Sequence, residues 1–197
     1  MPDMPLAVKL LYTVFVLAVV PVYWRTLGPL NFLWFSDIAL FAIVVAMWLE
    51  SSLIVSMQSI SVLAFEIGWT VDFAIGLLVG RSPLGLSTYM FRSQTPRVVR
   101  GLSLFHLALP PTLLWLLGRW GYDSRALLAQ TALGWIVMLA SYQFTPPAKD
   151  VNWVFGLGGR PQSRLPPSLY LALLMVGLAL LVYLPTHLLL RSVFESK

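Results

Sequence analysis

The hydrophobic positions of this chain come in long runs and do not follow the stripes of amphipathic helices. A run of roughly 18 or more apolar residues is the signature of a helix that crosses a lipid bilayer. The pattern therefore predicts an all-α fold, a polytopic integral membrane bundle of about six transmembrane helices. We expect a single transmembrane domain over residues 1–197, with spans at 7–24, 31–49, 53–79, 98–118, 125–145 and 167–190.

The composition argues against an ordinary soluble domain and against several kinds of site. Hydrophobic residues make up 58% of the chain and charged residues 11%, whereas a typical soluble domain has about 25% charged residues. With no cysteine and two well-separated histidines, we expect no disulfide, no metal site and no cofactor. The basic residues behind the net charge of +5 lie between the hydrophobic runs. Membrane topology and anionic lipid headgroups explain that placement, so no nucleic-acid partner is expected.

The distribution of basic residues predicts how the bundle is oriented. Six spans put both termini on one face and the two longest loops, 80–97 and 146–166, on the other. Of the 13 Lys and Arg residues, eight lie on the long-loop face and five on the terminal face. The positive-inside bias therefore predicts a multi-pass protein of the cell membrane with cytoplasmic long loops and both termini outside.

Four ionisable side chains fall inside the predicted spans: Asp37, Glu66, Asp72 and His106. A carboxylate in the bilayer centre costs about 2.5–3.5 kcal/mol on the insertion scale, so such groups face a bundle interior or a wet cavity. At ~1.5 Å per residue, Asp37, Asp72 and His106 lie about 9, 10 and 12 Å from the long-loop face, and Glu66 about 20 Å. We therefore expect Asp37, Asp72 and His106 to share one hydrated pocket.

Two prolines mark the same region of the fourth span. Pro110 and Pro111 cannot donate to the carbonyls of His106 and Leu107, four residues earlier. Freed carbonyls inside a membrane need other partners or water. The resulting kink favours a wet pocket at His106.

These residues suggest catalysis, with two other interpretations open. Asp37 or Asp72 bonded to His106 would orient the imidazole as a general base. Ser36 or Ser103 would then be the nucleophile, and Ser103 shares the helix face of His106. Alternatively, Glu66 and Asp72 form a proton or cation relay in a small transporter. A buried Asp–His pair that only fixes helix packing is the structural interpretation.

The loop after the fifth span adds candidates for substrate binding. Asn152 and Trp153 are followed by a glycine-rich stretch with Arg160 and Arg164. Backbone amides near glycines and two guanidinium groups suit a lipid phosphate. We expect these four residues, together with Glu66, to contact a membrane lipid.

Three segments resemble a known family. They are residues 31–40 (NFLWFSDIAL), Leu104-Phe105-His106 and Asn152-Trp153, and they are similar to the YwaF-like bacterial membrane proteins, which are related to eukaryotic acyltransferases acting on ether phospholipids. In the family pattern a Cys precedes the Asp of the second helix, and this chain has Ser36 there. The resemblance implies a shared fold and a shared pocket position.

The sequence thus favours an integral membrane protein with a polar intramembrane pocket. The concrete hypothesis is a lipid-acting enzyme that performs acyl transfer or hydrolysis with His106 as base. The alternatives are the small transporter and an accessory subunit that docks to other membrane protein subunits, for which the eight tryptophans are suited.

Overall fold

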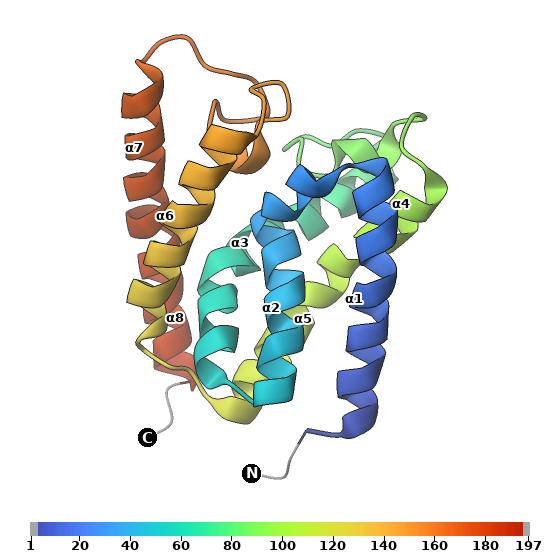
Figure 1. The fold of residues 1–197 in the computed structure, drawn as a ribbon, viewed down its shortest axis with the longest axis vertical. Helices are drawn as coiled ribbons and strands as arrows, with labels where there is room; N and C mark the ends of the chain where they lie inside the picture. Colours follow the sequence, from blue (N-terminus) through green and yellow to red (C-terminus); the bar gives the residue numbers. More distant parts are fainter. Residues whose placement is uncertain (1–3, 195–197) are drawn as a thin grey trace.

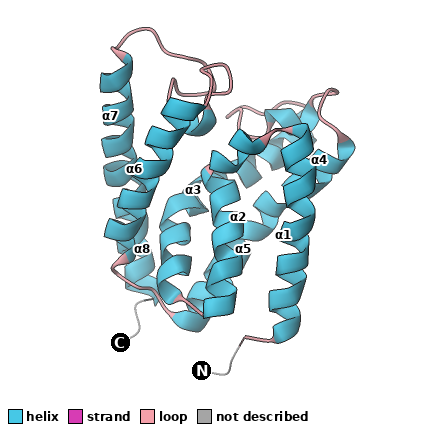
Figure 2. Ribbon diagram, in the orientation of Figure 1, coloured by secondary structure: helices cyan, strands magenta, loops and turns pink. Residues whose placement is uncertain are grey.

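The computed structural model describes residues 4–194, which fold into helices joined by loops (Figure 2). The loops contain three short 3₁₀ turns, which are η1 (Pro29–Leu33), η2 (Thr88–Phe91) and η3 (Val151–Trp153). A π turn, η4 (Ala179–Tyr183), lies between two helices near the end of the chain. The α-helices are α1 (Leu6–Thr26), α2 (Phe35–Leu49), α3 (Ser52–Val79), α4 (Arg97–Ser103), α5 (Phe105–Trp120), α6 (Ala126–Phe144), α7 (Pro167–Leu178) and α8 (Leu184–Phe194).

The helical membrane bundle predicted from the sequence is confirmed. Five helical segments are long and apolar enough to cross a membrane, namely Leu6–Thr26, Ser52–Val79, Arg97–Trp120, Ala126–Phe144 and Pro167–Phe194. The expected span at 31–49 differs, because it is divided into η1 and the 15-residue α2. At ~1.5 Å per residue α2 is about 22 Å long, shorter than the roughly 30 Å hydrocarbon core.

The bundle is organised around α3, which packs against α2, α5 and α6. Helix α1 lies against α2, while α7 and α8 lie against α6. Figure 1 shows the loops 80–96 and 145–166 at one end of the bundle and both ends of the chain at the other. That arrangement agrees with an even number of crossings.

The outer surface is apolar and the centre holds many polar groups. Leu78, Leu128 and Leu181 are 86%, 79% and 78% exposed. Lipid tails are as apolar as leucine, so this exposure costs nothing in a bilayer. Inside, the hydroxyl groups of Ser56 and Ser59 on α3 are fully buried and hydrogen-bonded, to the Asp123 backbone N–H and the Val55 carbonyl. Ser56 thus connects α3 to the loop before α6, whereas the Ser59 hydroxyl is bonded within α3 itself.

The fourth span is broken at Leu104, between α4 and α5. The Leu104 N–H donates to Gly101 and the Leu107 N–H to Leu104, both with 3₁₀ spacing. Helix α5 then continues through Pro110 and Pro111. A proline ring crowds the carbonyl four residues earlier, so distortion is expected on its N-terminal side. His106 consequently stands in the first turn of α5, directly after the break.

The sixth span contains the π turn η4. Tyr183 at its end is fully buried, and its ring lies on α6 where Gly134 has no side chain. A β-carbon at Gly134 would lie 2.8 Å from the Tyr183 hydroxyl oxygen. The close approach of α6 and η4 thus depends on that glycine.

Candidate functional site

The centre of the site is a pair formed by Glu66 of α3 and His106 of α5. Nδ1 of His106 lies 2.7 Å from Oε2 of Glu66, with the two side chains 13% and 4% exposed. The other ring nitrogen, Nε2, has no hydrogen-bond partner within residues 4–194. A carboxylate on Nδ1 fixes the imidazole tautomer and leaves Nε2 as the basic nitrogen.

Two aromatic rings hold the imidazole in place. Trp69 stacks on His106 with ring centroids 4.6 Å apart and planes at 24°, and Phe105 stacks with centroids 4.1 Å apart. Trp69 follows Glu66 by three residues, so both side chains point from α3 toward α5. The two stacked rings therefore fix the orientation of the imidazole ring.

A second carboxylate lies nearby at the start of α2. Asp37 is 3% exposed and accepts a hydrogen bond of 2.7 Å from Nδ2 of Asn31. It is close enough to Glu66 to interact electrostatically. Asp37 therefore belongs to the same polar group as the Glu66–His106 pair.

Two tyrosines and a serine extend this polar group toward α1. The hydroxyl groups of Tyr23 and Ser103 are 2.7 Å apart and buried. Tyr89, brought in by η2, reaches Ser103 and approaches Trp69, although the buried Nε1 of Trp69 lacks a partner of hydrogen-bond geometry within the described residues. Burial raises the pKa of Tyr89, which keeps its hydroxyl protonated.

Sequence reasoning did not identify Tyr23, Trp69 and Tyr89 as site residues. The available signal was the spacing of Trp69 three residues after Glu66, which shares its helix face. Tyr23 and Tyr89 lie at the edges of hydrophobic runs, a position that is typical of aromatic residues at the membrane interface.

The expected bond of Asp37 or Asp72 to His106 is not the one that the structure shows. Asp72 is fully buried and caps the following loop, accepting from the Leu84 N–H at 2.7 Å and the Ser87 N–H at 2.8 Å, and from the hydroxyls of Ser82 and Ser87. The loop after α3 folds back onto the helix end and occupies both carboxylate oxygens. Asp72 thus stabilises the loop, and Glu66 takes its expected place beside His106.

Asn152 positions the start of α2. Its Oδ1 accepts from the Phe35 N–H at 3.1 Å, and its Nδ2 donates to the Leu33 carbonyl at 2.7 Å and to the Ser141 hydroxyl at 3.1 Å. The backbone is left-handed at Asp150 (φ 42°), Asn152 (φ 55°) and Trp153 (φ 58°). This strained turn directs the Asn152 side chain into the bundle, so it ties α6 to the turn before Asp37.

The remaining predicted residues lie outside the polar group. Trp153 packs edge-on against Phe65 with ring centroids 5.8 Å apart. Arg160 and Arg164 are exposed on their loop. Ser36 is half-buried and its hydroxyl makes no hydrogen bond in the described part of the chain.

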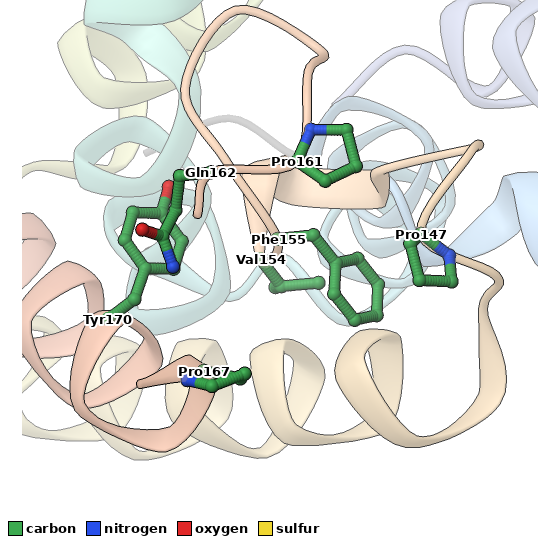
Figure 3. A pocket seen from close by; sticks show the side chains of 7 residues that line it. All are labelled: Pro147, Val154, Phe155, Pro161, Gln162, Pro167 and Tyr170. Atoms are coloured by element: carbon green, nitrogen blue, oxygen red, sulfur yellow. The ribbon is translucent and has the colours of Figure 1, made fainter. Parts of the chain in front are cut away.

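Two cavities lie at the long-loop end. The first, of about 170 Å³, is mostly apolar and separates the loop around Phe155 from the start of α7 at Pro167 and Tyr170 (Figure 3). The second, of about 220 Å³, is lined by Leu27, Asn31, Trp34, Lys149 and Val151. Asn31 connects this second cavity to Asp37.

The arrangement places one unbonded ring nitrogen beside two carboxyl groups inside the helical bundle. Glu66 contacts Nδ1 of His106, Nε2 is left without a partner among residues 4–194, and Asp37 lies close to Glu66. No group of three His, Asp or Glu residues within the same range could hold a metal ion. Comparisons with protein-family models, with curated proteins and with solved structures found no match for this chain.

Proposed function

We propose that this multi-pass membrane protein is an enzyme that transfers or hydrolyses the acyl group of a lipid, with His106 as general base. The observation that carries the proposal is the 2.7 Å contact of Glu66 with Nδ1 of His106, which leaves Nε2 without a partner among residues 4–194. A carboxylate–imidazole pair of this kind serves proton transfer in acyl chemistry. Its position inside an apolar bundle suits a substrate delivered from the bilayer.

The proposed step begins with a hydroxyl group, of water or of a lipid alcohol, at Nε2 of His106. Its proton moves to Nε2 as its oxygen attacks the ester carbonyl carbon, and Glu66 stabilises the imidazolium. The bond from that carbon to the leaving oxygen then breaks, and the leaving alkoxide takes the proton back from Nε2. His106 returns to its neutral form.

A serine nucleophile is the less favoured version of this step. Ser103 is bonded to Tyr23 and makes no hydrogen bond with His106. Ser36 has an unbonded hydroxyl within the described chain and occupies the position of the cysteine in the resembling family. A mass shift on Ser36 after incubation with an acyl lipid would favour a covalent route.

The test uses purified protein with phosphatidylglycerol carrying a labelled acyl chain, and mass spectrometry of released and transferred acyl groups. His106→Asn keeps an amide donor near the position of Nδ1 and removes the base, so turnover should fall by about 10²–10⁴-fold. Glu66→Gln should reduce turnover by more than about tenfold. His187→Asn changes the other histidine, which is bonded to Tyr122, and should leave turnover unchanged. Full activity of His106→Asn would rule out the proposal.

A proton relay is the second candidate, favoured by the electrostatic contact between Asp37 and Glu66. Protons would pass from the Asn31 cavity through Asp37 and Glu66 to His106. Proteoliposomes with an internal pH dye would show a flux that Glu66→Gln abolishes. The relay through Asp72 that the sequence suggested is less favoured, because both oxygens of Asp72 accept hydrogen bonds from its own loop. Glu50→Gln is the control, because Glu50 pairs with Lys9 and takes no part in the proposed path. Flux that persists in Glu66→Gln would exclude the relay.

A further inference from the structure

The cavity beside Asn31 is lined in part by Lys149 and Val151 of the loop 145–166. Figure 1 shows that this loop lies at the end of the bundle where the long loops gather. The cavity has a volume of about 220 Å³, which is below the roughly 300–1,000 Å³ of sites that enclose a whole drug-sized ligand. It therefore suits one polar fragment of a ligand whose remainder lies outside. In a membrane protein, the headgroup end of a lipid has that form.

One wall of the cavity carries an unpaired cation. Nζ of Lys149 donates to the Leu27 carbonyl at 3.3 Å and lies 3.9 Å from where a β-carbon of Gly28 would stand. The exposed ammonium group thus lies beside the Leu27–Gly28 turn, and Leu27 is 122 residues away in the chain. Lys149 forms no ion pair within residues 4–194. An ammonium group without a carboxylate partner attracts an anionic ligand.

The acidic neighbour of Lys149 in the chain does not neutralise it. Asp150 is buried, and its Oδ1 accepts from the Phe155 N–H at 2.8 Å. Burial raises the pKa of Asp150, which shifts this carboxyl group toward its neutral form. The charge of Lys149 is therefore available to a ligand.

The other walls supply a hydrogen-bond donor and an interfacial apolar surface. Asn31 uses one hydrogen of Nδ2 for Asp37, and the second has no partner in the described chain. Trp34 and Leu27 line the same space. Tryptophan prefers the headgroup layer of a bilayer, and Trp34 in the wall of the cavity agrees with a site at that layer.

We propose that this cavity binds the phosphate of an anionic phospholipid headgroup, with Lys149 as counter-charge and Asn31 as hydrogen-bond donor. The inference rests on the proposed function only in identifying the bound lipid as the substrate. Because Asn31 also holds Asp37, a ligand that engages Asn31 acts on the carboxylate nearest to the Glu66–His106 pair. Headgroup recognition and the candidate catalytic pair are thereby connected through a single amide.

The test is native mass spectrometry of the purified full chain titrated with short-chain phosphatidylglycerol, phosphatidylcholine of the same chain length, or inorganic phosphate. The wild-type protein should bind phosphatidylglycerol at least about fivefold more tightly than phosphatidylcholine. Lys149→Gln should weaken phosphatidylglycerol binding at least about tenfold, and Lys149→Arg should keep it within about threefold. Arg81→Gln, which changes an exposed cation of the same face, should alter it less than about twofold.

Equal affinities of the wild-type protein for the two lipids would overturn the proposal, whether or not Lys149→Gln folds. The proposal would equally fail if Lys149→Gln and Arg81→Gln had the same effect, because the attraction would then be a property of the whole face. Binding of inorganic phosphate as tightly as the lipid would overturn the assignment to a lipid headgroup. His106→Asn separates the two proposals: loss of turnover with intact lipid binding supports both, and full turnover removes the enzyme proposal while leaving the binding site standing.

Discussion

Replacing Asn152 should reveal how much of the stability of the fold depends on one side chain. Asn152→Ala removes three hydrogen bonds and leaves the Phe35 N–H, the Leu33 carbonyl and the Ser141 hydroxyl without that partner. Each unpaired buried group costs about 1–3 kcal/mol, so we expect about 3–9 kcal/mol for the three. Alanine at φ 55° adds about 1 kcal/mol, because an ordinary side chain disfavours the left-handed region.

A glycine variant separates the two contributions. Asn152→Gly loses the same three hydrogen bonds but adopts a positive φ at no steric cost. The free energy of unfolding of Asn152→Gly should therefore be about 1 kcal/mol higher than that of Asn152→Ala. Both values should lie well below that of the wild-type protein. The difference in free energy of unfolding between the two variants measures the backbone strain. The loss that both variants show relative to the wild-type protein measures the contribution of the three hydrogen bonds.

The assay is equilibrium unfolding in detergent micelles by titration with sodium dodecyl sulfate, followed by tryptophan fluorescence and circular dichroism. The chain has eight tryptophans, so the fluorescence change on unfolding is large. If both variants unfolded within about 1 kcal/mol of the wild-type protein, the bonds of Asn152 would not hold α2 against α6. Identical values for alanine and glycine would refute the strain contribution.

Two further predictions concern packing and pH. Gly134→Ala should destabilise the bundle by about 1–3 kcal/mol, because its β-carbon would lie 2.8 Å from the Tyr183 hydroxyl oxygen; Gly177→Ala, with open space around it, is the matched control in the same unfolding assay and should be neutral. Hydrogen bonds from Arg125 lower the pKa of Asp123 in the folded protein. The contribution of Asp123 to the stability of the fold is therefore complete above the unfolded pKa of about 3.9, and it is lost as pH falls through the lower folded pKa. Thermal unfolding of Asp123→Asn should show a lower midpoint than the wild-type protein at pH 7, and the difference should vanish in strong acid; a constant difference across pH would contradict this.

The fold was largely predictable because the thickness of a bilayer sets a minimum length for each apolar run. Five of the six expected spans are helices of that length. The span at 31–49 is the exception, since its first residues form η1. The start of α2 depends on hydrogen bonds that join Asn152 to Leu33 and Phe35. Asn152 is distant in sequence, so the apolar composition of residues 31–49 could not predict these bonds.

The polar residues inside the spans could be found from the sequence, but which of them pair could not. Counting residues from a helix end gives a depth along the helix axis, and it gives no information on which helices face each other. It also assumes straight helices whose ends mark the membrane surface. The break at Leu104 and the loop that folds back onto Asp72 both violate that assumption. Glu66 therefore meets His106, although the two estimated depths differ by about 8 Å.

The π turn of the last span changes which residues face inward along it. Leu178 packs against the bundle, and a regular helix would next turn Leu181 inward, yet Leu181 is 78% exposed and Tyr183 is buried. From Tyr183 the buried positions continue at His187 and Leu190 with ordinary helical spacing. The π turn thus shifts the helical register by one residue, so that the buried faces of α7 and α8 lie on the same side of the span. Deleting one residue from it would rotate α8 by about 100° and turn its packed face toward lipid.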